Sequence, residues 1–282
     1  MTLYLRGYFV IFMFFQIKSY IKFLYNSKNE HGVHSPFVFD LVTKCFYDKE
    51  SKPDPSVSEQ AKQYQVLKKY RNSLLENKSK IEVVDFGAGS KVFNSNTRQI
   101  AKIAKTAGIS PKRAELLFRI VNYFQPSTIL EIGTSLGLAT SALALGNPKA
   151  KITTLEGCPN TMAIAKNQLQ LLNINNVELV NIEFKNYLQK FSKTIPLGGL
   201  DLIYFDGNHS KNATLGYFEL LLPTITNNSV WIFDDIHWSK DMETAWEIIK
   251  KHKEVTVTID TFQWGLVFFR KEQEKEHFVI RT

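Results

Sequence analysis

The sequence is poor in cysteine. Only Cys45 and Cys158 occur among its 282 residues, and they lie far apart and in unlike contexts. Such usage argues against a disulfide framework and is typical of a reducing compartment, so we expect a cytoplasmic protein. Internal repeats and low-complexity stretches are also absent, and 44% hydrophobic with 22% charged residues is enough to bury one large core.

The sequence also lacks an apolar run long enough to cross a membrane as a helix. Between Arg6 and Lys18 there are eleven uncharged residues, whereas a spanning helix needs about 20. No small-residue cleavage site follows, which argues against a secretory signal. We expect residues 1–24 to be an interfacial helix giving peripheral membrane contact, a homodimer contact, a helix packed on its own domain, or an upstream extension.

Acidic residues are outnumbered by basic ones, with a net charge of +8 and a pI near 9.2. The lysines are scattered, however, and the main basic cluster lies within residues 68–80, in a predicted helix and loop. A solvated face explains this pattern better than a nucleic-acid site does. We therefore expect no nucleic-acid partner.

Helical patterns dominate the first part of the chain. Residues 1–80 are predicted to be mostly helical, interrupted at Ser35-Pro36 and by a polar loop over residues 51–56. From there on, short apolar strands and amphipathic helices alternate. We therefore expect a doubly wound α/β fold with a mostly parallel seven-stranded sheet in residues 81–282, preceded by an N-terminal helical extension of residues 1–80.

Local signals mark several elements of this second part. Ser110 is a typical helix cap with Pro111 behind it, and residues 255–259 and 264–269 are expected to close the sheet as a hairpin. A short strand near residue 81 runs into the turn Gly87-Ala-Gly89, which mimics a ligand-binding turn. No acidic strand end follows at the right distance, so we do not assign a site to it.

The nonamer of residues 129–137, Ile-Leu-Glu-Ile-Gly-Thr-Ser-Leu-Gly, is a buried-strand pattern that runs directly into a glycine turn and a helix. Doubly wound folds hold nucleotide-like ligands at such turns. The spacing differs from the Gly-x-Gly-x-x-Gly of dinucleotide binders, and a carboxylate at the strand end repels phosphate but suits a cationic ligand. The residues expected to hold this ligand are Glu131, Gly133, Thr134, Ser135 and Gly137.

A second acid follows at the tip of the next predicted strand. Residues 151–156 end in Glu156, 23 residues after Gly133, and a helix signal begins at Pro159. An acid at this place can accept hydrogen bonds from both hydroxyls of a ribose. Glu156 is thus the expected ribose ligand, with a surface glutamate at a strand end as the alternative.

Three carboxylates follow the fourth and fifth core strands. Asp206 ends residues 200–206, with His209 three residues later, and Asp234 and Asp235 end residues 229–235. Parallel neighbours bring their carboxyl ends to one edge of the sheet, so these carboxylates should converge beside the ligand. Such charge needs a cation, and oxygen ligands favour Mg²⁺ or another hard divalent ion.

The glycine turn resembles the first motif of class I S-adenosylmethionine-dependent methyltransferases. The resemblance implies that residues 129–137 hold the methionine part of S-adenosylmethionine, and that Ile182, just beyond the third strand, lies where related enzymes contact adenine. The ordinary alternative is a strand, turn and helix in some other α/β protein.

The carboxylates resemble those of metal-dependent small-molecule O-methyltransferases related to catechol O-methyltransferase and to the macrolide sugar O-methyltransferases. That resemblance implies Asp206, Asp234 and Asp235 as ligands of Mg²⁺ or another divalent ion, and His209 as the catalytic base. A metal-free alternative is also open, in which Asp206 faces the cofactor, Asp234 binds substrate and Asp235 caps a helix. His237 is expected to have a packing or hydrogen-bonding role beside Trp238.

Residues 31–39 (HGVHSPFVF), 85–90 (DFGAGS) and 233–239 (FDDIHWS) resemble an uncharacterised group of bacterial class I methyltransferases. No substrate comes with that group. The resemblance to the O-methyltransferases implies an enzyme that methylates a hydroxyl of a small-molecule acceptor, with Asp206 and His209 as catalytic residues, and we expect the helices of residues 1–80 to cover the acceptor side. The acceptor stays open between a phenol, a sugar and a lipid or cell-wall intermediate. Rival hypotheses are a nicotinamide-dependent oxidoreductase and a catalytically silent cofactor-binding module.

Overall fold

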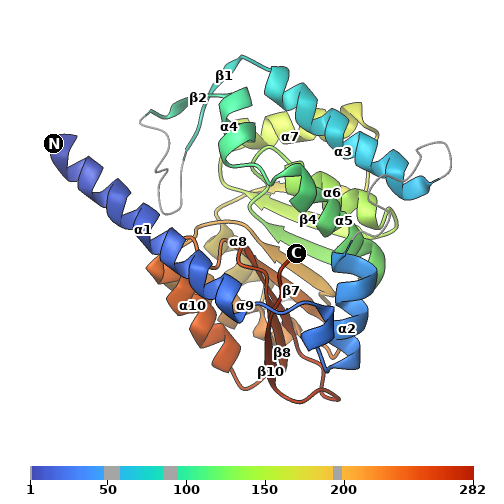
Figure 1. Ribbon diagram of the computed structural model, residues 1–282. Helices are drawn as coiled ribbons and strands as arrows, with labels where there is room; N and C mark the ends of the chain where they lie inside the picture. The colour runs from blue at the N-terminus through green and yellow to red at the C-terminus, as the bar shows by residue number, and fades with distance from the viewer. Residues whose placement is uncertain (1, 48–57, 85–94, 193–198) are drawn as a thin grey trace.

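Apolar strands that alternate with helices along the chain form an eight-stranded sheet, seen in part in Figure 1. Its strand order is β10-β8-β9-β7-β6-β3-β4-β5. The computed structural model describes residues 2–47, 58–84, 95–192 and 199–282, with the backbone alone for residues 2–13. The predicted loop at 51–56 and the turn at 87–89 lie outside these residues. The strands of the large sheet are β3 Thr128–Ile132, β4 Lys151–Glu156, β5 Val177–Asn181, β6 Leu202–Phe205, β7 Val230–Asp234, β8 Val257–Asp260, β9 Trp264–Phe268 and β10 Glu276–Val279.

Helices cover both faces of this sheet. Because side chains alternate along a strand, Leu202 and Tyr204 of β6 face one cluster of buried residues while Ile203 and Phe205 face the other. The first cluster is completed mainly by α2, α3, α5 and α6, and the second by α8, α9 and α10. The α-helices are α1 Thr2–Asn26, α2 Pro36–Leu41, α3 Glu59–Glu76, α4 Ile100–Thr106, α5 Pro111–Phe124, α6 Leu138–Gly146, α7 Pro159–Leu171, α8 Phe184–Phe191, α9 Lys211–Leu221 and α10 Lys240–Lys251. Two 3₁₀ helices, η1 Glu30–Gly32 and η3 Leu222–Thr224, and a π-helix, η2 Val42–Phe46, complete the helical elements of the described residues.

The predicted α/β class and the mostly parallel sheet are confirmed, with one strand more than the seven expected. Strand β9 runs antiparallel to β7 and β8, and the predicted hairpin is formed by β8 and β9. The additional strand is β10, which pairs in parallel with β8. The residues of β10 did not indicate a strand, because the first two of its four residues are exposed and polar. A separate small sheet pairs β1 Lys80–Glu82 with β2 Thr97–Gln99.

The N-terminal extension packs on the same core as the sheet. Val38, Leu41 and Phe46 from α2 and η2, and Leu67 and Leu74 from α3, belong to the buried cluster that contains β3 and β6 side chains. These helices therefore stabilise the sheet directly, since they share its hydrophobic core.

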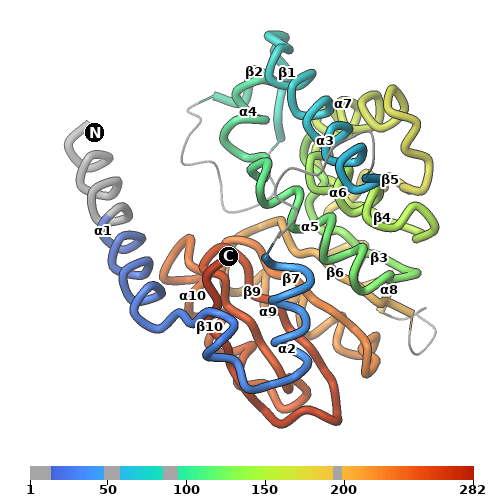
Figure 2. Tube along the Cα trace, turned by 45° about the vertical axis from the view of Figure 1, so that its right-hand side comes forward, coloured from blue at the N-terminus to red at the C-terminus, as the bar shows by residue number. Residues whose placement is uncertain are grey.

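Helix α1 lies on the outside of the molecule in both views (Figures 1 and 2). One side contacts the body: Phe23 is buried, and its ring lies 5.5 Å from that of Phe262 in the loop before β9. On the other side Phe14, Ile21 and Tyr25 are exposed. Within the described residues, no helix is both long and apolar enough to cross a membrane.

Candidate active site

The carboxyl ends of β3, β6 and β7 meet at one edge of the sheet, and each is followed by a residue in the left-handed conformation. These residues are Ser135 with φ 49°, Asn208 with φ 52° and Asp235 with φ 55°. Left-handed backbone is uncommon outside glycine, although Asn and Asp tolerate it, and it often persists at functional sites. Three such turns lie together at the edge where the ligand was expected from the sequence, while Gln125, Asn173 and Phe262 adopt this conformation elsewhere.

Gly133 is required where β3 approaches β6. Its φ is 106°, and a β-carbon there would lie 2.3 Å from the backbone oxygen of Asp206. Gly137 caps the N-terminus of α6 with φ 79°, and a β-carbon on it would lie 2.3 Å from the hydroxyl of Tyr70. That hydroxyl donates a hydrogen bond of 2.9 Å to the carbonyl of Leu136. Tyr70, which belongs to α3 and was not predicted, thus holds the turn from behind.

Glu131 lies beneath the turn and has no exposed surface. Its Oε2 accepts hydrogen bonds of 2.5 Å from the hydroxyls of Thr140 and Thr154, and these join β3 to α6 and β4. Burial raises the pKa of Glu131 to about 7, although both hydroxyls lower it. Glu131 was expected to touch the cofactor. As placed it supports the turn from inside, so direct contact with a ligand requires a rearrangement.

Thr134 is also buried, and its hydroxyl lies 2.6 Å from that of Thr154. Its backbone N–H donates to the carbonyl of Leu155 at 3.1 Å, which ties the turn to β4. The side chain of Thr134 therefore holds two strands together at the base of the turn.

Glu156 lies at the end of β4 and is partly exposed. Its Oε2 accepts a hydrogen bond of 2.7 Å from the N–H of Ser135, and its Oε1 accepts one of 2.8 Å from the N–H of Cys158. Burial raises the pKa of Glu156 above its usual range. Ile182, half-buried, donates its N–H to the Glu156 carbonyl at 3.0 Å. The structure thus brings Gly133, Ser135, Glu156 and Ile182 to one edge.

A pocket opens beside this turn. One wall belongs to the turn and α6, another to α4 and the loop between α4 and α5, and Asp206 lies at the pocket as well. The helices of residues 1–80 were expected to cover the acceptor, whereas this pocket is walled by residues 103–109. Its lining consists of Ile103, Ala104, Ala107, Gly108, Ile109, Thr134, Ser135, Leu136, Leu138, Ala139 and Asp206.

An arginine that was not predicted lies among the three carboxylates. Nη2 of Arg113, from the first turn of α5, forms an ion pair with Oδ1 of the buried Asp234. Oδ1 also accepts the N–H of Asp235 at 2.8 Å, and Oδ2 accepts the hydroxyl of Tyr204 at 3.1 Å. Asp234 is therefore engaged by a cation and two further donors.

The three carboxylates as placed do not fit a divalent metal site. No group of three His, Cys, Asp or Glu side chains in the described ranges has an arrangement that could hold a metal ion. A divalent ion needs several oxygen ligands at close range. To use Asp234, such an ion must first displace the guanidinium of Arg113, because both address the same carboxylate.

The remaining two carboxylates flank His209. Nε2 of His209 lies 3.6 Å from Oδ1 of Asp206, and the imidazole is partly exposed. Burial, followed by the charges of Asp234 and Asp235, raises the pKa of Asp206 well above its usual range. Burial and Asp234 also raise the pKa of Asp235 to about 6, against the opposing effect of His209. The predicted pair Asp206 and His209 is thus adjacent in the structure.

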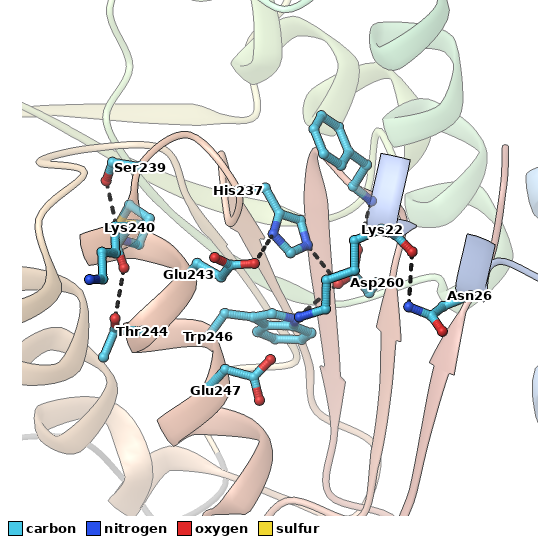
Figure 3. A network of polar contacts seen from close by, with 12 residues as sticks. Lys22, Asn26, His237, Ser239, Lys240, Glu243, Thr244, Trp246, Glu247 and Asp260 are labelled. Atoms are coloured by element: carbon cyan, nitrogen blue, oxygen red, sulfur yellow. Dashed lines mark hydrogen bonds and ion pairs between the residues drawn. The ribbon is translucent and has the colours of Figure 1, made fainter. Parts of the chain in front are cut away.

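His237 is engaged in a separate network (Figure 3). Its Nε2 lies 2.8 Å from Oδ2 of Asp260 and its Nδ1 lies 3.4 Å from Oε1 of Glu243. Trp246 donates to the same Asp260 oxygen at 3.2 Å. These contacts tie α10 to β8, which agrees with the hydrogen-bonding role expected of His237.

Comparison with known proteins relates this domain and its fold to methyltransferases. Residues 130–236 match a family described as a methyltransferase domain. The SAH-bound methyltransferase PaMTH1 of Podospora anserina superposes with a TM-score of 0.57 at 14% identity, covering 85% of this chain and 97% of that one. The O-methyltransferase of Bacillus cereus in complex with SAH gives a TM-score of 0.51 at 19% identity, covering 75% and 92%. At these identities the likeness concerns the fold.

Residues 130–236 thus form a methyltransferase domain, and the doubly wound fold and the glycine turn around Gly133 agree with a class I S-adenosylmethionine-dependent methyltransferase. The chain is accordingly an enzyme. Its methyltransferase domain includes the ends of β3, β4, β6 and β7, the four strands that form the site.

Proposed function

We propose that this enzyme transfers a methyl group from S-adenosylmethionine to a hydroxyl oxygen of a small-molecule acceptor. The observation that carries the proposal is the adjacent pair His209 and Asp206, with Asp206 also at the pocket beside the cofactor turn. A hydroxyl must lose its proton when its oxygen is methylated, and a histidine held by a carboxylate is suited to take it. The O-methyltransferase of Bacillus cereus has the same fold, which agrees with this choice.

The cofactor would be held across the ends of β3 and β4. Gly133 and Ser135 provide the turn, Glu156 provides acceptors for ribose hydroxyls, and Ile182 provides an apolar contact for the adenine. When bound, the cofactor supplies an electrophilic methyl group on a sulfonium. The carboxyl oxygens of Glu156 and Asp206 lie at this edge and favour a neighbouring positive charge.

His209 would act on the acceptor. The imidazole takes the hydroxyl proton while the acceptor oxygen forms its bond to the methyl carbon. The bond between that carbon and the sulfonium sulfur breaks at the same time, so that S-adenosylhomocysteine is the leaving group. Asp206, which lies 3.6 Å from Nε2, stabilises the imidazolium that results. Metal assistance by Mg²⁺ stays a prediction from the family resemblance. We favour the metal-free alternative because Arg113 already neutralises Asp234.

Two measurements test the proposal. Calorimetry should show binding of S-adenosylhomocysteine and none of NAD, which separates a methyltransferase from an oxidoreductase. Turnover with labelled S-adenosylmethionine across panels of phenols, sugars and lipid intermediates, with and without excess chelator, should then identify an acceptor. Binding without turnover on any hydroxyl acceptor contradicts an O-methyltransferase and favours a silent binding module.

A further inference from the structure

We propose that Arg113 is the resident cation of the acceptor side and takes the place, among the three carboxylates, that was assigned from the sequence to a divalent ion. The proposal builds on the proposed function, since it concerns the same site. It starts from the ion pair between Nη2 of Arg113 and Oδ1 of Asp234. Burial raises the pKa of Asp206 and of Asp235, and the charge of Arg113 opposes this rise, so Arg113 acts electrostatically on all three carboxylates.

Contacts at the start of α5 and on the sheet hold this guanidinium in place. Ser110 caps α5 by accepting the N–H of Arg113 at 3.3 Å, and Pro111 occupies the first helical position. The guanidinium carbon lies 5.0 Å from the ring centroid of the buried Trp264, and Trp264 pairs in register with Asp234 across β9 and β7. Arg113 is thus held between an aromatic face and a carboxylate.

Placing a cation here has an electrostatic reason. Buried carboxylates are costly unless a positive charge or protons compensate them. Arg113 is nearly buried, and although burial lowers its pKa, the charge of Asp234 raises it above the usual range. The guanidinium therefore stays charged, and it compensates the negative charge of the carboxylates in place of a metal ion.

The role that follows for Arg113 is positioning. By engaging Asp234 it leaves Asp206 and His209 to face the acceptor. Nε of Arg113 is buried without a hydrogen-bond partner among the described residues. Arg113 acts on the reaction through the carboxylates, so its removal should change their affinity for cations.

The experiment measures Mn²⁺ binding to the full-length enzyme by electron paramagnetic resonance. Wild type and Arg113→Lys should bind no tightly held Mn²⁺. Arg113→Ala should gain roughly one Mn²⁺ per chain, because the three carboxylates then lack their cation and are free to close around an ion. Lys112→Ala is the matched control: it removes an exposed cation from the same helical turn and should gain none.

S-adenosylhomocysteine affinity is measured in parallel, because its retention shows that the cofactor side is intact. Should Arg113→Ala fail to fold, Arg113→Gln supplies a neutral side chain of similar length and the same gain is expected. The proposal is overturned if wild type binds Mn²⁺ as tightly as the variants, or if a folded neutral variant gains no Mn²⁺. An enzyme that binds no S-adenosylhomocysteine contradicts the proposed function instead.

A separate observation concerns α1, whose outer face carries an apolar stripe. Phe14 is 64% exposed, Ile21 61% and Tyr25 90%, and Ile17 and Leu24 on the same side are also exposed. From this stripe we infer that the outer face of α1 binds an anionic lipid surface. The opposite side is the one that faces the protein, through Phe23 and Phe262.

The charges favour a lipid surface over a second copy of the chain. Lys18 and Lys22 border the stripe and are exposed, and the whole chain carries +8. Two such faces would bring like charges together, whereas anionic headgroups neutralise them. One helical stripe is also small against the roughly 1,600 Å² that a stable protein interface buries. A lysine-bordered apolar stripe with aromatic side chains is typical of interfacial helices.

Sedimentation with vesicles tests this inference. Wild type should bind vesicles of phosphatidylcholine with phosphatidylglycerol, should bind phosphatidylcholine alone more weakly, and should be released by salt. Ile21→Glu should abolish binding, and Lys18→Glu with Lys22→Glu should abolish the dependence on phosphatidylglycerol. Leu171→Glu, at an exposed leucine on α7, should bind as wild type does. A dimer in solution that Ile21→Glu dissociates, without vesicle binding, would overturn the inference.

Discussion

A β-carbon on Gly133 would lie 2.3 Å from the backbone oxygen of Asp206. The cofactor turn can therefore approach the end of β6 only because residue 133 has no side chain. Gly133→Val should therefore lower the melting temperature and the affinity for S-adenosylhomocysteine together, since backbone atoms cannot yield as a flexible side chain can. Differential scanning fluorimetry and calorimetry measure both effects.

The matched control is Gly216→Ala in α9, where an added β-carbon meets no atom within 4 Å. Removal of a glycine from a helix should raise stability, by up to about 1 kcal/mol. Unchanged cofactor affinity in Gly133→Val would contradict the placement of the cofactor at this turn.

Glu156→Gln should weaken S-adenosylhomocysteine binding by about tenfold or more, because a charged acceptor for the ribose hydroxyls becomes a neutral one. The amide oxygen can still accept the N–H of Ser135, so the fold should survive. Glu178→Gln, on the neighbouring β5 and exposed, should bind as wild type does. Equal affinities of the two variants in calorimetry would show that Glu156 is not a ligand.

The buried Glu131 should make stability depend on pH. Its pKa is raised from 4.5 in the unfolded chain to about 7 in the folded one, so the folded state holds the proton more tightly. The stabilisation is fully present below pH 4.5 and is lost as pH rises through 7, to a total of about 3 kcal/mol. Urea unfolding of wild type and Glu131→Gln at several pH values isolates this contribution, because the amide does not titrate. Parallel pH profiles of the two proteins would contradict it.

His209→Asn should lower turnover by roughly 100-fold to 10,000-fold, the usual contribution of a general base. Affinity for S-adenosylhomocysteine should hardly change, since His209 lies at the acceptor side near Asp206. His34→Asn, at an exposed histidine of the N-terminal extension, should have wild-type turnover. Steady-state kinetics against an identified acceptor would decide, and full activity of His209→Asn would remove the proposed base.

Much of the fold was predictable from local pattern. The strand and turn at Gly133, the acid at Glu156 and the cap at Ser110 are short-range signals, and the structure has each of these elements where expected. Strand β10 was not predicted, because tertiary contact with β8 rather than an apolar run determines its pairing. The depth of Glu131 could not be read from sequence either, since it depends on Thr140 and Thr154 closing over it.

The missing member of the site was Arg113, which lies 121 residues before its partner Asp234. One signal could have pointed to it. A helix N-terminus repels positive charge, yet Arg113 stands in the first turn of α5 directly after a strong cap. A basic residue in an unfavourable place indicates a nearby acid, although only the folded sheet shows which one.

The segment that directly follows α1 pairs with residues 279 and 280 at the β10 edge of the sheet. The N–H of Lys28 donates to the carbonyl of Val279 at 2.8 Å, and Lys28 bridges to Ile280 in parallel. An open sheet edge can recruit strands from other molecules and lead to aggregation. The segment around Lys28 thus covers the edge of the sheet. Whether a truncated protein self-associates therefore depends on where the truncation begins. Removal of α1 alone leaves this segment in place, whereas a cut beyond Lys28 uncovers β10 and should produce a protein prone to self-association.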